Sequence, residues 1–369
     1  MSTHLHNVVN VHDLNSNNEH AKTSEMSEYE SAGPNIAQSL FMWVLALFWS
    51  AVTCIRLAID WFKHRDTFFD VKEHPKPEVL DGWTHENVQL SQVKLHYVEA
   101  GDMDHPLMLM IHGFPEFWYS WRYQIRYFQK DHHVVAVDMR GYNESDKPEG
   151  VEQYDSSLIA KDIKELIRAL NHERAVLVAH DWGAAIAWRV AGEYPEVVEK
   201  LIVLNCPHPL TFVELIRTSF AQVRKSWYMF LFQIPWLPEY MWKANDYKML
   251  KNALRSEATG IKKKEHFTDE DEKAWLFTFS QPNAFTAPIN FYRVSRRLQM
   301  PSSPVKPKTL IIWGTEDAFI EKCAAEMSTK YCEVAQVHFI NGASHWVQQD
   351  EPDAVNECID KFLRGISIH

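Results

Sequence analysis

Residues 176–185 read VLVAHDWGAA and are the most informative part of the chain for its fold. An apolar, β-branched run leads into it, and a run of small, helix-prone residues leads out. The sequence therefore predicts a strand, a sharp turn and a helix, which is the setting of a nucleophile elbow. Asp181 stands at the tip, where enzymes with a serine nucleophile carry Ser in G-x-S-x-G, and Ala179 and Gly183 are small enough for a tight turn. A carboxylate nucleophile forms an alkyl ester on the protein, which argues against acyl transfer.

The composition is that of an ordinary folded protein. The chain has 369 residues, enough for one large or two modest domains, and its net charge of -11 with no long basic run argues against nucleic acid as a partner. The five cysteines are scattered without zinc-binding spacing, so we expect reduced thiols and a cytosol-facing domain. The 14 Trp and 20 Phe fit either a core packed with large side chains or the lining of an apolar pocket.

Residues 1–35 are polar and lack a hydrophobic period, which predicts a disordered tail. Histidines recur in this tail, at His4, His6, His12 and His20. Metal binding is the alternative interpretation, but nothing in the surrounding sequence would order a site.

Residues 36–62 predict a transmembrane anchor. Residues 31–55 contain no charged side chain, and a spanning helix needs about 20 apolar residues. Arg56 can extend to the membrane interface, and Trp61 and Phe62 suit the headgroup region. A cleaved signal peptide is an alternative, against which the long polar and acidic stretch ahead argues. A buried helix of a soluble protein is the other alternative.

The flanking charges predict the orientation of this anchor. Acidic residues precede it and basic residues follow it, so the positive-inside tendency places the C-terminal domain in the cytosol. The one glycosylation sequon, residues 143–145, lies in a loop expected near the active site, where a glycan would be awkward. We expect a single-pass protein of the endoplasmic reticulum membrane.

The hydrophobic pattern beyond the anchor predicts an α/β fold. Residues 84–100 alternate as paired strands would, and short apolar runs then alternate with helical patterns, which is typical of a mostly parallel sheet covered on both faces. The expected strands after residue 100 cover 107–111, 134–137, 175–179, 201–204, 309–313 and 337–340, and the expected helices among them cover 117–128 and 155–170. We expect a core of residues 80–208 and 301–369. Residues 209–300 break the alternation and predict an inserted, aromatic-rich helical cap over the carboxyl ends of the strands.

A nucleophile elbow needs a base, an acid that orients the base, and amide donors for an oxyanion. In chain order the nucleophile is followed by the acid and then the histidine. Asp317 comes just after one expected strand and His345 just after the next, so both should share an edge of the sheet with Asp181. Glu316 is the alternative acid. An ordinary loop histidine is the alternative for His345, and the order of the three residues argues against it.

Amide donors for the oxyanion are expected from two places. The stretch HGFP, residues 112–115, follows a strand at the position that supplies the second oxyanion amide in this kind of site. We therefore assign the donors to the backbone N–H groups of Phe114 and Trp182.

Together these motifs resemble the epoxide hydrolases of the α/β-hydrolase family. The matching stretches are HGFPE (112–116), DMRGYNESDKP (138–148), HDWG (180–183), GTED (314–317) and SHW (344–346). The similarity covers about residues 80–365, and the anchor makes the membrane-anchored epoxide hydrolases of animals, the epoxide hydrolase 4 type, most similar. Asn143 departs from the pattern, since relatives usually have Gly there, and we expect a local change of the turn.

The resemblance implies two cap tyrosines that hold and protonate the epoxide oxygen, and their counterparts here are Tyr228 and Tyr292. A phenol is a hydrogen-bond donor at neutral pH. Packing as ordinary cap aromatics is the alternative for both. Tyr119, Tyr142 and Tyr240 are weaker candidates.

The expected reaction is hydrolysis of a lipophilic epoxide to a vicinal diol through an ester on Asp181, without metal or organic cofactor. Fatty-acid epoxides are the expected substrates, from the resemblance, the aromatic cap and the anchor. Trp182, Phe114 and Trp346 are expected to line the substrate pocket. The alternatives are a haloalkane dehalogenase, which has no use for two phenols, and an inactive membrane-tethered binding protein, which would usually have lost one of the three catalytic residues. The oligomeric state is not indicated.

Overall fold

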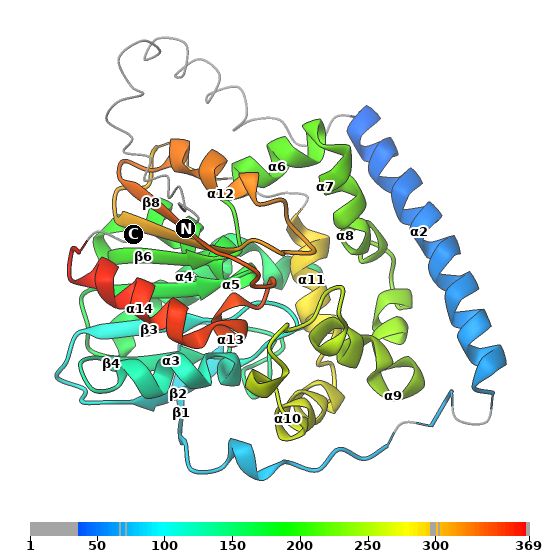
Figure 1. Cartoon of the computed structure of the whole chain (residues 1–369), viewed down its shortest axis with the longest axis horizontal. Coiled ribbons are helices and arrows are strands. Elements are labelled where there is room, and N and C mark those ends of the chain that lie inside the picture. The colour runs from blue at the N-terminus through cyan, green and yellow to red at the C-terminus, as the bar shows by residue number, and fades with distance from the viewer. Residues whose placement is uncertain (1–35, 66–67, 71, 296–299, 302, 367–369) are drawn as a thin grey trace, which may run out of the picture.

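A mostly parallel sheet runs through the middle of the molecule (Figure 1). The computed structural model describes residues 36–65, 68–70, 72–295, 300–301 and 303–366. Among them the sheet has eight strands in the order β1-β2-β4-β3-β5-β6-β7-β8. The strands are β1 (Thr84–Gln89), β2 (Lys94–Ala100), β3 (Leu107–Ile111), β4 (His133–Val137), β5 (Ala175–His180), β6 (Val198–Leu204), β7 (Lys308–Gly314) and β8 (Ala335–Ile340). The pairs β1–β2 and β2–β4 are antiparallel. All the other neighbouring strands in this order are parallel. The predicted α/β-hydrolase fold is confirmed.

Helices cover both faces of this sheet, which is why its central strands are continuously apolar. Every residue of β3, β4 and β5 is buried. On one face lie α3 (Arg122–Phe128) and α14 (Pro352–Leu363), and on the other lie α4 (Ser156–Ala169) and α5 (Trp182–Glu193), as Figure 1 shows. Two short helices, α12 (Cys323–Ser328) and α13 (Val347–Asp350), follow β7 and β8. The predicted helix over 117–128 forms, but its first turn is a 3₁₀-helix, Trp118–Trp121.

The strand order brings the predicted functional segments to one edge of the sheet. Because β5, β6, β7 and β8 are parallel neighbours, the residues that follow them meet at the carboxyl edge. Asp181 follows β5, Asn205 follows β6, Asp317 comes shortly after β7 and His345 shortly after β8. The turn after β3, which contains Phe114, lies on the other side of β5. Ligands of α/β sheets bind at this edge.

The segment between β6 and β7 is helical and lies over that edge. Its helices are α6 (Pro209–Thr218), α7 (Phe220–Lys225), α8 (Trp227–Leu231), α9 (Leu237–Arg255), α10 (Asp269–Ser280) and α11 (Thr286–Val294). The helix α9 is broken at residues 244–247, where Asn245, Asp246 and Tyr247 have positive φ. We call this inserted segment the cap. Its boundaries at residues 209 and 300 and those of the two core segments remain a prediction.

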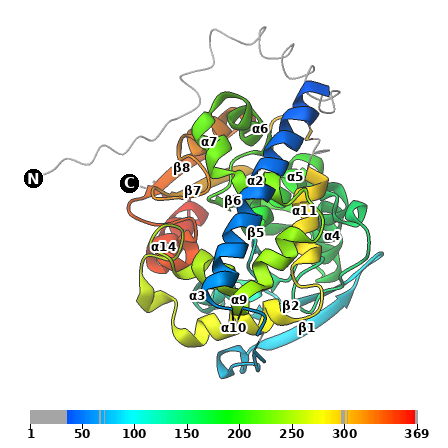
Figure 2. The same cartoon turned by 90° about the vertical axis from the view of Figure 1, so that its right-hand side faces the viewer.

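The N-terminal helix α2 (Ile36–Lys63) lies against the outside of the cap (Figure 2). Its segment Ser39–Lys63 is long and apolar enough to cross a membrane. One face of α2 packs on α8 and α9, with the ring of Trp49 5.6 Å from that of Trp227 and Asp60 paired with Lys248. The opposite face exposes apolar side chains, including Leu40, Phe41, Val44, Leu47, Phe48, Ile55, Ile59 and Phe62. The predicted polar tail, residues 1–35, lies outside the described residues.

Candidate active site

Asp181 stands on a strained turn between β5 and α5. Its backbone has φ 48° and ψ -121°, a conformation that L-residues rarely adopt and that tends to persist at functional sites. Two glycines make the turn possible. A Cβ on Gly183 would lie 2.3 Å from the carbonyl oxygen of Ile111, and one on Gly113 would lie 2.5 Å from the Cβ of Asp181. The tight turn predicted from the small neighbours of Asp181 is therefore confirmed.

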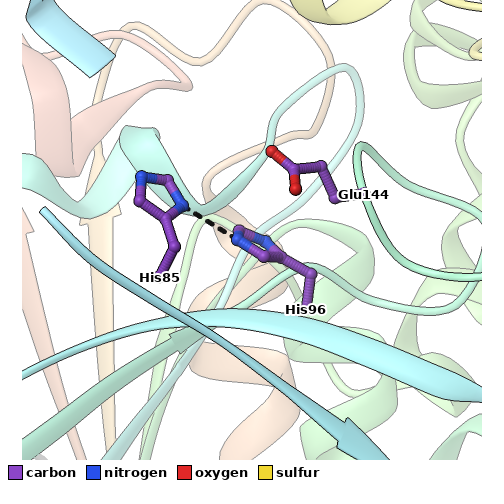
Figure 3. Close-up of side chains that lie close together, drawn as sticks. All are labelled: His85, His96 and Glu144. Atoms are coloured by element: carbon purple, nitrogen blue, oxygen red, sulfur yellow. Dashed lines mark hydrogen bonds between the residues drawn. The ribbon is translucent and has the colours of Figure 1, made fainter. Parts of the chain in front are cut away.

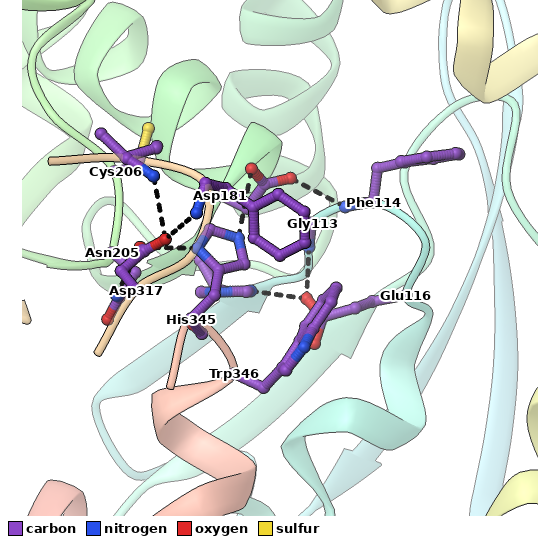
Figure 4. A network of polar contacts seen from close by, with 12 residues as sticks. Gly113, Phe114, Glu116, Asp181, Asn205, Cys206, Asp317, His345 and Trp346 are labelled. Carbon is purple, nitrogen blue, oxygen red and sulfur yellow. Dashed lines mark hydrogen bonds and ion pairs between the residues drawn. The ribbon is translucent and has the colours of Figure 1, made fainter. Parts of the chain in front are cut away.

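The two carboxylate oxygens of Asp181 have different partners (Figure 4). The backbone N–H of Phe114 donates to Oδ1 at 2.9 Å. Oδ2 lies 3.6 Å from Nε2 of His345. One oxygen is thus fixed by an amide of the turn after β3, and the other faces the imidazole.

His345 is held in one orientation by Asp317. The Nδ1–H of His345 donates to Oδ2 of Asp317 at 2.8 Å, since a carboxylate can only accept. The same Oδ2 accepts from the side-chain amide of Asn205 at 2.7 Å, and Oδ1 accepts from the backbone N–H groups of Phe319 and Ile320. Asp317 therefore stays ionised with its lone pairs occupied, and Nε2 of His345 is turned toward Asp181.

Charge coupling shifts the pKa of each group in this triad. Burial works against the charged form of His345, but the carboxylates of Asp317 and Asp181 outweigh it and raise the pKa of His345 to about 10. Burial likewise opposes ionisation of Asp181 and Asp317, yet contacts with His345 hold the pKa of both carboxyls below the ordinary value. At neutral pH the resting site is an imidazolium between two carboxylates.

Beneath the triad lies a buried pair, Glu116 and His180. Glu116 Oε2 lies 2.7 Å from His180 Nδ1 and accepts from the backbone N–H of Gly113 at 2.9 Å. The Nε2 of His180 lies 2.8 Å from the backbone carbonyl oxygen of His345. The side-chain amides of Gln348 and Gln349 donate to Oε1 of Glu116. This network ties the turn that contains Phe114 to the loop that contains His345.

A cavity of about 120 Å³ opens above Asp181 and His345. Its walls are mostly apolar and aromatic, with Trp227, Phe232, Trp242 and Phe319 among them. Both predicted phenols line it, with their ring centroids 5.9 Å apart. Burial and the nearby charge of Asp181 raise the pKa of Tyr228 and Tyr292 well above the ordinary value, so both hydroxyls keep their protons at neutral pH.

The other predicted site residues fall in different places. Phe114 and Trp346 line this cavity, but Trp182 lines a second, smaller one and touches Tyr292 with its ring, 4.9 Å between centroids. Within the described part of the chain, the only backbone N–H that donates to the Asp181 carboxylate is that of Phe114, and Trp182 is the first residue of α5. Glu316, the alternative acid, pairs with Lys262 at 3.3 Å and does not contact His345.

The comparisons with known proteins agree with this geometry. A family model described as alpha/beta hydrolase fold matches residues 106–352. Epoxide hydrolase 2 of Caenorhabditis elegans is 44% identical over 316 residues, which cover 84% of this chain and 88% of the relative. Epoxide hydrolase 4 of Homo sapiens is 45% identical over 300 residues, covering 79% and 83%. The crystal structure of a Bacillus megaterium epoxide hydrolase with an inhibitor matches with a TM-score of 0.70 and 33% identity, covering 76% of this chain and 100% of that one.

The chain belongs to the epoxide hydrolases of the α/β-hydrolase fold.

Two parts of this epoxide hydrolase site had no predicted role. Asn205 follows β6 directly, and a polar residue after a buried strand at the catalytic edge was a signal that could have indicated it. Glu116 belongs to one of the matching stretches, but sequence gave no sign that it pairs with His180, because the two are 64 positions apart. Asn143, the departure from the family pattern, has φ 40°, a left-handed conformation that Asn tolerates.

The Glu116 network of this epoxide hydrolase carries a testable expectation. Glu116→Gln removes the negative charge of the oxygen that His180 and the backbone N–H of Gly113 both contact. We expect the free energy of unfolding to fall by about 2 kcal/mol, the scale of a hydrogen bond to a charged group. Turnover should fall with it, because the loops of Phe114 and His345 lose a common support. Urea unfolding and kcat measure the two effects, with the exposed Glu357→Gln as the matched control. If Glu116→Gln had the stability and kcat of the wild type, the Glu116 network would not support the catalytic loops.

Proposed function

We propose that this epoxide hydrolase opens lipophilic epoxides in two steps, through a hydroxyalkyl ester on Asp181. The observation that carries the proposal is the elbow carboxylate with one oxygen held by an amide and the other facing a histidine, under a cavity lined by two phenols. A carboxylate in this position can act as a nucleophile, and His345 then lies beside the resulting ester as the base for its hydrolysis.

In the first step, Oδ2 of Asp181 attacks an epoxide carbon and the carbon–oxygen bond of the ring breaks. Tyr228 and Tyr292 donate hydrogen bonds to this epoxide oxygen, and a phenol with a raised pKa is fully protonated for this task. One phenol passes its proton to the alkoxide, and the proton that His345 releases before the second step restores that phenol. The oxygen Oδ1 stays on the Phe114 amide and becomes the ester carbonyl.

In the second step, alkylation has removed the negative charge of Asp181, so the pKa of His345 falls from about 10 and the imidazole loses its proton more readily. His345, oriented by Asp317, then takes a proton from water, which attacks the ester carbonyl carbon. The Phe114 amide, together with the proposed second donor on Trp182, holds the oxyanion. The ester bond breaks, and Oδ2 leaves with the diol and takes the remaining proton of the attacking water. Asp181 is again a carboxylate and His345 an imidazolium.

The two steps should depend differently on pH. The pKa of Asp181 is lowered and those of the phenols are raised, so ester formation should be level between about pH 5 and pH 9. Ester hydrolysis needs neutral His345 and should rise with pH. Rapid quenching and mass spectrometry of the intact protein measure both rates. A formation rate that climbs with pH while hydrolysis stays level would contradict these assignments.

We further propose that α2 anchors the enzyme in the endoplasmic reticulum membrane with the catalytic domain in the cytosol. The helix packs on the cap, so the anchor would hold the cap side against the lipid, from which a lipophilic epoxide could enter. Phe220 and Trp236 of the cap are 84% and 82% exposed and suit such a surface. Two observations support the cytosolic side. The cysteines are free, and the sequon residue Asn143 uses its amide nitrogen to bind Asp138.

Fatty-acid epoxides fit this proposal only if the chain extends out of the cavity. The cavity has a volume of about 120 Å³, which is smaller than the cavity of about 150 Å³ that holds benzene in another protein. It therefore accepts the three-membered epoxide ring and only the first few atoms of the chains attached to it.

The proposed function is tested with a panel of fatty-acid and styrene-type epoxides on the wild type and Asp181→Ala. Diol should form with the wild type only. Diol release by Asp181→Ala would overturn the assignment of the nucleophile. Halide release from haloalkanes without diol formation would favour the dehalogenase, and no turnover of any epoxide would favour the inactive binding protein.

A further inference from the structure

A pair of histidines that takes no part in the catalytic triad lies on the first two strands (Figure 3). His85 is in β1 and His96 is in β2, and these strands are paired so that His85 faces Val98 and His96 faces Asn87. Because side chains alternate between faces, His85 and His96 are diagonal neighbours on the same face. Nδ1 of His85 lies 2.9 Å from Nε2 of His96.

Each ring has a partner on its other nitrogen. Nε2 of His85 lies 3.4 Å from the backbone carbonyl oxygen of Leu80, and Nδ1 of His96 lies 2.7 Å from a carboxylate oxygen of Asp138. Since carbonyl and carboxylate oxygens only accept, both of these nitrogens carry hydrogen. The two facing nitrogens share one proton between them, and they are the atoms that can bind a metal ion once that proton is lost. Histidines that bind metals almost always have such an acceptor on the far nitrogen.

A third ligand stands beside the pair. The carboxylate of Glu144 lies with the two facing nitrogens in a group whose atoms are all within 4.8 Å of one another. The turn that carries Glu144 is fixed on both sides, because the amide of Asn143 donates to the Asp138 carboxylate and the hydroxyl of Ser145 donates to the Asp138 carbonyl. His96 is fully buried, while Glu144 is exposed, so the group is open to solvent on the side of Glu144.

We propose that His85, His96 and Glu144 form a binding site for a divalent transition-metal ion, and that Zn²⁺ is the ion this ligand set fits best. Two imidazoles and a carboxylate are common zinc ligands, and water completes a tetrahedron. The ion displaces the proton shared by the two nitrogens, which passes to solvent. Tetrahedral Zn²⁺ with Zn–N bonds of about 2.05 Å needs the nitrogens about 3.3 Å apart, so they move by about 0.4 Å from their present 2.9 Å.

The charges around the site agree with a divalent ion. Asp138 and Glu144 face it with two negative charges, and Lys76 and Lys94 are the cations that act on the two rings.

The chain offers a matched control in a second histidine pair. His133 Nδ1 lies 3.1 Å from His172 Nε2, and the other nitrogen of His133 lies 3.2 Å from Glu99. This pair repeats the carboxylate–His–His arrangement, but among the described residues no third metal-ligating side chain stands beside its facing nitrogens. It should therefore bind a metal ion far more weakly.

The test is a titration of the full chain with Co²⁺, followed by its visible absorption, and with Zn²⁺, followed by calorimetry. Both are done in a background in which His4, His6, His12 and His20 are alanine, so that the tail does not contribute. We expect one tetrahedral Co²⁺ site that Zn²⁺ displaces, and a rise of several degrees in Tm with Zn²⁺. His85→Ala should weaken Zn²⁺ binding by about 100-fold and Glu144→Gln by about 10-fold, while His172→Ala should leave it unchanged.

Several results would overturn the proposal. One is the absence of a stoichiometric Co²⁺ site in the background chain. Another is a site that persists in His85→Ala or that is lost in His172→Ala. Glu144 is exposed, so Glu144→Gln folds normally and decides the matter if His85→Ala does not fold. If Glu144→Gln bound Zn²⁺ as tightly as its parent, Glu144 would not be a ligand and the proposed site would be wrong.

Discussion

Replacing His345 with glutamine should stop the catalytic cycle at the ester on Asp181. The first step needs only the carboxylate and the phenols, whereas the second needs a base at the position of Nε2, 3.6 Å from Oδ2 of Asp181. Glutamine keeps the volume of the side chain but takes up no proton from water. We expect steady-state turnover to fall by about 10²–10⁴-fold, the usual contribution of a general base, and the protein to gain the mass of one substrate.

Intact mass spectrometry after mixing with epoxide measures the accumulation, and peptide mapping places the added mass. His105→Gln, in the turn before β3, is the control and should turn over like the wild type. If His345→Gln showed no added mass while retaining less than a hundredth of the wild-type rate, His345 would act before the ester forms, and the division of labour between the two steps would be wrong.

Removing the phenol hydroxyls should have a comparable effect on the other step. Tyr228→Phe and Tyr292→Phe each delete one donor to the developing alkoxide and keep the ring contacts of the cavity wall. Loss of one donor to an oxyanion costs about 10²–10³ in rate, and loss of both leaves the alkoxide without a donor. We expect each single variant to slow ester formation by that factor and the double variant to form no detectable ester.

Single-turnover experiments measure this rate, and Tyr240→Phe, half-exposed on the outside of the cap, is the control. A Tyr228→Phe variant that forms the ester at the wild-type rate would leave Tyr292 as the only acid. A double variant that still forms it would exclude both tyrosines.

The sequence predicted much of the fold because the sheet is buried on both faces. Runs such as residues 107–111 and 175–179 are apolar throughout, and each is a strand within one residue of its expected limits. The same pattern placed Asp181, Asp317 and His345 after strand ends, and the parallel order of β5 to β8 brings them together. The sequence favoured Asp317 as the acid and left Glu316 as the alternative, since neighbours in a loop can point either way.

Other features depend on contacts between distant segments and were beyond local pattern. The pairing of Glu116 with His180 joins two strand ends, and Asp60 of α2 contacts Asn245 in the break of α9. The side chain of Trp182 was expected in the substrate pocket, but α5 turns it toward Tyr292 and a separate small cavity. These outcomes follow from how segments that are distant in the chain pack together, which no single stretch of sequence encodes.

The nucleophilic role of Asp181 is tested most directly by a single turnover in ¹⁸O-labelled water with enzyme in excess over epoxide. If the ester forms on Oδ2 and water attacks its carbonyl carbon, the first diol carries unlabelled oxygen from Asp181, and the label appears in the Asp181 carboxylate on peptide mapping. A second turnover should then deliver label to the diol. Label in the diol from the first turnover, with none in Asp181, would show that water attacks the epoxide directly and that Asp181 is not the nucleophile.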